Sequence, residues 1–147
     1  MTAHDYGPVF GAAPVGVVCY PRRAAYAVIS NSHGGVAAIR AALLDGTSKY
    51  WLPGGGMQPT ESPEEAVVRE VREELGRDIY MLGRVGQAVQ FFYAATEDRW
   101  YEMTAIFIRA RFENEGAGSG EYQLHWLDAL HHAEFFHACH AWAATLA

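Results

Sequence analysis

Three glutamates, Glu70, Glu73 and Glu74, are spaced so that a helix would bring their carboxylates to one side. At about 100° per residue, Glu74 falls about 40° to one side of Glu70 and Glu73 about 60° to the other. No basic residue shares this arc, and adjacent like charges destabilise a helix by about 0.2–0.5 kcal/mol per pair. Local costs of this kind concentrate at functional sites. Because clustered carboxylate oxygens suit Mg²⁺ or Mn²⁺, the spacing indicates a divalent metal site.

The alternative interpretation of these charges is a solvated helix face on which Arg69 and Arg72 relieve the repulsion. The position of the cluster favours the metal site, because three consecutive glycines, Gly54 to Gly56, precede the helix. Glycine backbone can approach other groups closely, so carboxylates and free carbonyl oxygens would converge there. The segment lacks the Gly-Lys-Ser/Thr of a phosphate-binding P-loop. A phosphate group would therefore approach this acidic helix only through bridging cations.

The helix that must carry the glutamates has clear signals at both ends. Ser62 is a serine N-cap, Pro63 occupies the first helical position and Glu65 completes a capping box. Gly76 is well placed to end the helix. We therefore expect a helix over residues 62–75. Its apolar arc, which lies beside the carboxylates, contains Val67, Val68, Val71 and Leu75.

The segments on either side of this helix have the composition of strands. Asp128 is expected to begin a final helix that runs toward Thr145. Strands before and after a central helix predict an α/β (α+β) sandwich with a mixed β-sheet, formed by residues 1–147 as a single domain. The expected strands cover 15–20, 24–30, 36–44, 50–52, 79–84, 87–95, 102–112 and 122–127.

The composition bounds the class of protein. The chain has 147 residues, 50% of them hydrophobic, and a net charge of −6, which disfavours nucleic acid as a partner. Much of this acidity lies between residues 61 and 78, which hold seven acidic residues and three arginines. Cys19 and Cys139 form no metal-binding pair, and no leader or membrane span is evident. These features predict a cytoplasmic protein without membrane spans.

The run 55–77 resembles the Nudix box of the Nudix hydrolase family. Gly55 is followed after five residues by Glu61, and after seven more by the run 69–76, Arg-Glu-Val-Arg-Glu-Glu-Leu-Gly. Every fixed position of the box is present. Arg77 is the one departure, because the family usually has an apolar residue there.

The resemblance implies an α/β/α sandwich and a pyrophosphohydrolase. The expected reaction is attack of water at phosphorus on a nucleoside diphosphate linked to another moiety, as in an NTP or dNTP, a dinucleoside polyphosphate or a nucleotide sugar. It also implies that Glu70, Glu73, Glu74 and the backbone carbonyl of Gly54 hold Mg²⁺ or Mn²⁺. Arg69 would brace the glycine-rich loop against the helix together with a second box residue, Glu61.

Residues outside the box are candidates for the remaining steps. The general base is either a box glutamate or a glutamate from a later loop, for which Glu121 is preferred and Glu102 comes second. Arg40 precedes the box at a place from which an arginine could contact the diphosphate. Tyr93 has an offset from the box that resembles the tyrosine of dinucleoside-polyphosphate members. An ordinary surface or core role is the alternative for each of these residues.

Several alternatives stay open. A non-catalytic nucleotide-binding or regulatory module could use the same fold. A homodimer is compatible with the sequence, which does not fix the oligomeric state. The C-terminal histidines form either an exposed histidine-rich face or, less readily, a zinc site. They are His131, His132, His137 and His140.

Overall fold

A computed structural model of the chain describes residues 7–114, 116, 118–128 and 134–147. None of the helices in these ranges is both long enough and apolar enough to cross a membrane. The elements, in chain order, are β1 (Val9–Phe10), β2 (Cys19–Val28), β3 (Val36–Ala42), β4 (Ser48–Trp51), β5 (Gly54–Gly56), α1 (Pro63–Leu75), β6 (Ile79–Ala94), β7 (Arg99–Phe112), β8 (His125–Leu127) and α2 (Ala138–Ala144).

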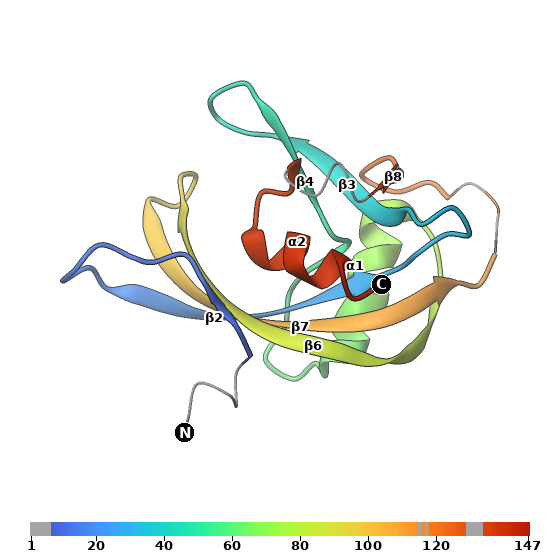
Figure 1. Ribbon diagram of the computed structural model, residues 1–147, viewed down its shortest axis with the longest axis horizontal. Helices are drawn as coiled ribbons and strands as arrows, with labels where there is room; N and C mark the ends of the chain where they lie inside the picture. Colours follow the sequence, from blue (N-terminus) through green and yellow to red (C-terminus); the bar gives the residue numbers. More distant parts are fainter. Residues whose placement is uncertain (1–6, 115, 117, 129–133) are drawn as a thin grey trace.

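The two helices cover opposite faces of the larger sheet (Figure 1). This mixed sheet has the order β1-β6-β7-β2-β5, with β2 parallel to β7 and antiparallel to β5, and a smaller antiparallel sheet has the order β4-β3-β8. Side chains alternate along a strand. Tyr26 and Val28 of β2 therefore pack in the cluster that contains α2, while Ala25 and Ala27 pack against α1. The predicted α/β sandwich with a mixed sheet is confirmed.

Helix α1 begins and ends where the sequence predicts. Ser62 Oγ accepts a hydrogen bond from the Glu65 N–H, and the Glu65 carboxylate accepts one from the Ser62 N–H, both at 3.1 Å. Gly76 ends the helix with φ 63°, and a Cβ there would lie 2.2 Å from the carbonyl oxygen of Ser119. Only glycine allows the later loop to approach the end of α1 this closely.

Two predicted strand breaks are wrong. The strands expected at 15–20 and 24–30 are one continuous strand, β2, which begins only at Cys19 and ends at Val28. Pro21 is tolerated because β7 pairs with it on one side, while β5 on the other side pairs only with residues 24–26. The strands expected at 79–84 and 87–95 are likewise one strand, β6, with irregular register around Gly83 and Gly86.

The C-terminal helix is shorter than predicted. It begins at Ala138 and not at Asp128, and residues 129–133 of the predicted helix lie outside the described part of the chain. Phe135 forms a bridge to Tyr50 of β4, which requires extended backbone and delays the start of the helix. Because α2 has no capping side chain at its own start, the Cys139 N–H donates instead to Gln90 Oε1 on β6 at 3.0 Å.

Candidate active site

The three glutamates of α1 lie on one side of the helix but differ in burial. Glu74 is buried, with 8% of its surface exposed, Glu70 is half-buried and Glu73 is exposed. This order follows their positions on the helix, because Glu74 lies closest to the apolar arc that packs on the sheet. The carboxylates therefore lead from solvent toward the protein interior.

The carboxylate of Glu74 is held against strand β5. The Gly54 N–H donates to Glu74 Oε1 at 2.8 Å. Burial, together with the charges of Glu70 and Glu121, raises the pKa of Glu74 to about 8, against the opposing effect of the Gly54 hydrogen bond. Gly54 has φ 144°, and a Cβ there would lie 2.2 Å from the carbonyl oxygen of Ala25. This contact with Glu74 thus depends on glycine at position 54.

Arg69 connects α1, β5 and the segment between them. Its Nε and Nη2 donate to the two carboxylate oxygens of Glu61 at 2.6 and 2.9 Å, and Nη2 also donates to the Gly56 carbonyl at 3.1 Å. Its Nη1 donates to Glu70 at 2.9 Å and lies 3.4 Å from a Glu73 oxygen. The hydrogen bonds from Arg69 are the main reason that the pKa of Glu61 is lowered to about 2. Arg69 is thus placed to brace the glycine-rich strand against the helix.

The donor atoms at this place suit a hard divalent cation. Glu70 and Glu74 meet successive glycines of β5, since a Cβ at Gly55 would lie 3.0 Å from the Glu70 carboxyl group. Within the described ranges, no group of three Asp, Glu, His or Cys side chains is already arranged to hold a metal ion. The carboxylates of Glu70 and Glu74 instead accept hydrogen bonds from Arg69 and from the Gly54 N–H. A cation would relieve the burial of negative charge at Glu74. The residues therefore fit Mg²⁺ or Mn²⁺ by donor type and charge.

The loop after β7 brings Glu121 beside the carboxylates. The Glu121 N–H donates to the Glu73 carbonyl at 3.0 Å, and the Tyr122 N–H donates to the Glu74 carbonyl at 2.7 Å. Glu121 is itself exposed, and its charge contributes to the raised pKa of Glu74. Glu102, the other candidate base outside the box, is exposed on β7 and does not line the adjacent cavity. Of these two residues, the structure brings Glu121 to the site.

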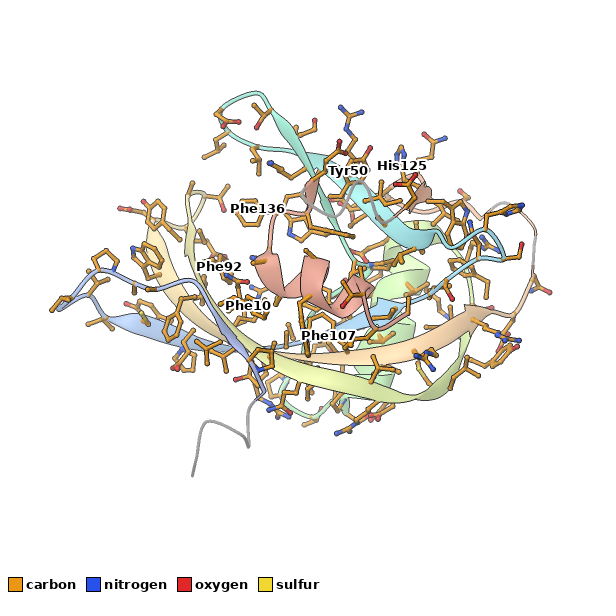
Figure 2. All side chains as sticks on the ribbon, in the orientation of Figure 1. Phe10, Tyr50, Phe92, Phe107, His125 and Phe136 are labelled. Atoms are coloured by element: carbon orange, nitrogen blue, oxygen red, sulfur yellow. The ribbon has the colours of Figure 1, made fainter. Side chains whose placement is uncertain are left out.

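A cavity of about 630 Å³ adjoins the carboxylates. Gly54 and Glu74 form part of its wall, and the segments 41–45 and 93–97, at the ends of β3 and β6, contribute further residues. Figure 2 shows Phe92 on β6 and Phe136 just before α2, both of which line it. The aromatic lining residues are Tyr26, Trp51, Phe92, Tyr93, Tyr101, Tyr122 and Phe136.

The two predicted substrate-binding residues differ in placement. Tyr93 lines the cavity, is 42% exposed and donates its hydroxyl hydrogen bond to Asp98. Arg40 is exposed on β3 and is not among the lining residues, although Ile39 and Ala41 are. Side-chain alternation along the strand accounts for this difference. The structure therefore brings Tyr93 to the cavity and leaves Arg40 outside it.

Some cavity residues give no distinctive signal in the sequence. Arg22 lies in β2 within an ordinary Pro-Arg-Arg run, and Trp51 and Phe136 come from segments far apart in the chain. The rings of Trp51 and Phe136 stack with centroids 5.0 Å apart. Only the tertiary arrangement shows that these residues share a wall.

His137 and His140 do not lie on the predicted exposed face. His137 and His140 are buried, with 4% and 0% of their surfaces exposed. Burial lowers the pKa of His137 to about 4 and that of His140 well below its ordinary value. The Leu52 N–H donates to His140 Nδ1 at 3.1 Å, so this imidazole supports the segment just before Gly54. His131 and His132 lie outside the described residues.

The family follows from the sequence match. A family profile described as the NUDIX domain matches residues 20–140, so the chain belongs to the NUDIX family, whose members generally use a divalent metal. Diphosphoinositol polyphosphate phosphohydrolase 3-alpha of Mus musculus is 40% identical over 70 residues, which are 45% of this chain and 39% of that protein. The 8-oxo-dGTP diphosphatase of Proteus vulgaris is 36% identical over 53 residues, 35% of this chain and 47% of that protein. The chain thus aligns with less than half the length of each relative.

Solved structures share the fold. A NUDIX hydrolase from Nitrosomonas europaea has a TM-score of 0.63 at 17% identity, covering 86% of this chain and 87% of that chain. The MutT protein from Methanosarcina mazei Go1 has a TM-score of 0.63 at 24% identity, covering 87% and 91%. At these identities the likeness establishes the fold alone.

Proposed function

We propose that this chain is a metal-dependent hydrolase that cleaves the pyrophosphate linkage of a nucleoside diphosphate linked to another moiety. The proposal rests on one observation: Gly54 and Glu74, which contact each other at the predicted metal site, also line the aromatic cavity of about 630 Å³. A diphosphate bound at the carboxylates would have room for its nucleoside among aromatic rings. Such rings stack on any nucleobase.

Each part of the site has a role in this reaction. Glu70, Glu73, Glu74 and the Gly54 carbonyl would hold Mg²⁺ or Mn²⁺, which would neutralise charge on the diphosphate and make the attacking water more acidic. Arg69 holds the carboxylate of Glu70 in place relative to β5. A carboxylate beside the site accepts the proton of the attacking water, and the position of Glu121 supports it in this role.

The lining of the cavity favours a nucleotide over the diphosphoinositol polyphosphate named for the mouse relative. A polyphosphorylated inositol has no aromatic face, and its phosphates require several cationic partners. Of the described residues that line the cavity, Arg22 is the one arginine or lysine, whereas aromatic rings come from several elements. This balance of aromatic and cationic groups suits a nucleoside with a short phosphate chain.

The direct test is hydrolysis of a panel with Mg²⁺ or Mn²⁺, with products identified by mass. The panel contains NTPs, dNTPs including 8-oxo-dGTP, dinucleoside polyphosphates, nucleotide sugars and a diphosphoinositol polyphosphate. We expect metal-dependent cleavage of a nucleotide, loss of that activity in Glu70→Gln, and retention in Glu65→Gln. The control glutamate lies on the same helix, and glutamine can still serve in its capping box. Tight nucleotide binding without turnover would instead indicate a non-catalytic module.

The assignment of the base has its own test. Glu121→Gln should lower kcat by about 10²–10⁴-fold if this carboxylate takes the proton, whereas Glu102→Gln should leave kcat unchanged. Both residues are exposed, so neither change should affect folding. Full activity in Glu121→Gln would transfer the role to a box glutamate.

A further inference from the structure

Arg22 lacks the partners that its burial calls for. It lies on β2, is half-buried and lines the cavity, and its Nε is buried without a hydrogen-bond partner. Among the described residues it takes part in no ion pair, whereas Arg69, Arg72 and Arg84 each contact a carboxylate. A buried donor without an acceptor is rare in proteins and calls for an explanation, such as a functional role.

The guanidinium of Arg22 lies between the two ends of the site. Its Nη2 is 3.3 Å from the place where a Cβ of Gly56 would stand, next to the strand that contacts the carboxylates of α1. On the other side, its Cζ lies 5.8 Å from the centroid of the Tyr101 ring, one of the aromatic lining residues. A ligand that extends from the carboxylates to the rings would therefore pass Arg22.

The charges around this guanidinium leave it free for an anion. Glu97, which also lines the cavity, accepts a hydrogen bond from the Tyr101 hydroxyl. His137 is kept neutral by burial, which lowers its pKa, and the nearby charge of Arg22 adds to this effect. Arg22 is thus the cation in the described lining that could balance charge on a ligand away from the carboxylates.

We propose that Arg22 is a substrate-binding residue that donates hydrogen bonds to the phosphoryl group on the nucleoside side of the cleaved linkage. The planar fork of a guanidinium matches phosphoryl oxygens, and such charge-assisted hydrogen bonds are strong. The inference rests on the proposed function, because it places the same nucleotide in the same cavity. It adds that a nucleoside monophosphate moiety is recognised by the chain itself, apart from any metal.

The test compares ligands that differ by one phosphoryl group, in EDTA so that no metal contributes. Binding of AMP, GMP, CMP and UMP and of the matching nucleosides is measured by ¹⁵N NMR titration. We expect wild-type protein to bind at least one monophosphate about tenfold or more tightly than its nucleoside. Arg22→Met should remove this preference by weakening only the monophosphate. Arg22→Lys, which keeps the charge without the fork, should retain part of it.

The control is Arg111→Met, which should keep the preference. Arg111 is an exposed residue of β7 that pairs with Tyr80 of β6 and does not line the cavity. A wild-type protein that does not distinguish the two ligands would overturn the inference. So would an Arg22→Met variant that keeps the preference, or one that loses nucleoside and monophosphate affinity equally, which would indicate a contact with the base. Failure of the proposed function would give a different result: the monophosphate preference would persist, but there would be no metal-dependent turnover.

Discussion

The two helices cover opposite faces of one sheet, and they hold their functional groups in opposite ways. On α1 the polar groups are charged and paired, as in the contacts of Arg69 with Glu61 and Glu70. On and just before α2 they are neutral and enclosed by rings: His140 lies 4.2 Å from the Tyr26 ring centroid, and His137 lies 4.6 Å from that of Phe92. Helix α2 contains no aspartate, glutamate, lysine or arginine.

This difference separates two tasks. Apart from the buried Glu74, the charged groups on α1 keep part of their hydration, so they can be positioned for chemistry at small cost to folding. The buried groups of α2 have lost hydration and depend on fitted partners, so they determine the shape and stability of the cavity wall. Substitutions on the α1 side should therefore reduce activity more than stability, and substitutions on the α2 side should do the reverse.

The largest expected effect is that of Glu74→Gln. Glutamine can still accept the Gly54 hydrogen bond, and it replaces a carboxyl group whose pKa burial raises to about 8, so the free energy of unfolding should stay unchanged or rise. Activity should fall by about 10²–10⁴-fold as a carboxylate of the site is lost. Denaturant titration and steady-state kinetics on the best substrate of the panel measure the two quantities. Equal loss of stability and activity would remove the distinction between the helices.

Arg69→Gln should have the next largest effect, because it releases Glu70 and the glycine-rich strand from their common partner. We expect activity to fall by about 10–100-fold, with a higher Mg²⁺ concentration needed for half-maximal rate. Arg72→Gln is the matched control on the same helix, since Arg72 is exposed and pairs with Asp78. An unchanged metal requirement in Arg69→Gln would contradict the bracing role.

Gln90→Leu tests the α2 side. The change leaves the buried Cys139 N–H at the start of α2 without its acceptor, and it should lower the free energy of unfolding by about 1–3 kcal/mol. Gln87→Leu on the same strand, whose side chain has no such bond to α2, should change it by less than about 0.5 kcal/mol. Both values come from urea titration. Equal stability of the two variants would show that this bond does not secure the helix.

The smallest effect is the contribution of His137 to acid stability. Burial lowers its folded-state pKa to about 4, so the unfolded chain takes up a proton below pH 6.5 while the folded protein does not. The contribution of neutral His137 to the free energy of unfolding is complete above pH 6.5 and is lost as pH falls toward 4. The loss is about 1 kcal/mol over the first pH unit below 6.5. His137→Phe keeps an aromatic ring beside Arg22 and His140 without this titration. The stability difference between wild type and His137→Phe should therefore shift by that amount between pH 6.5 and 5.5.

The local parts of this protein could be predicted from the sequence. Capping at Ser62 and Gly76 and the spacing of Glu70, Glu73 and Glu74 depend on neighbouring residues in one helix, and the structure places each of them as the periodicity indicates. The strand break expected at Pro21 is wrong, because only the sheet shows which side of that residue lacks a strand partner. Whether the protein is cytoplasmic and forms a single domain stays a prediction.

What only the tertiary structure decided is which distant residues share the cavity. Strand β2 contributes Arg22, β4 contributes Trp51, and the segment before α2 contributes Phe136 and His137. None of these positions is distinctive in its own segment. The sequence does not distinguish Arg22, which lines the cavity, from Arg40, which does not. The glutamates proposed to bind metal belong to one helix whose period fixes their directions. The cavity residues come from chain segments that meet only after folding, so their directions depend on sheet register and on the face that each strand turns to the core.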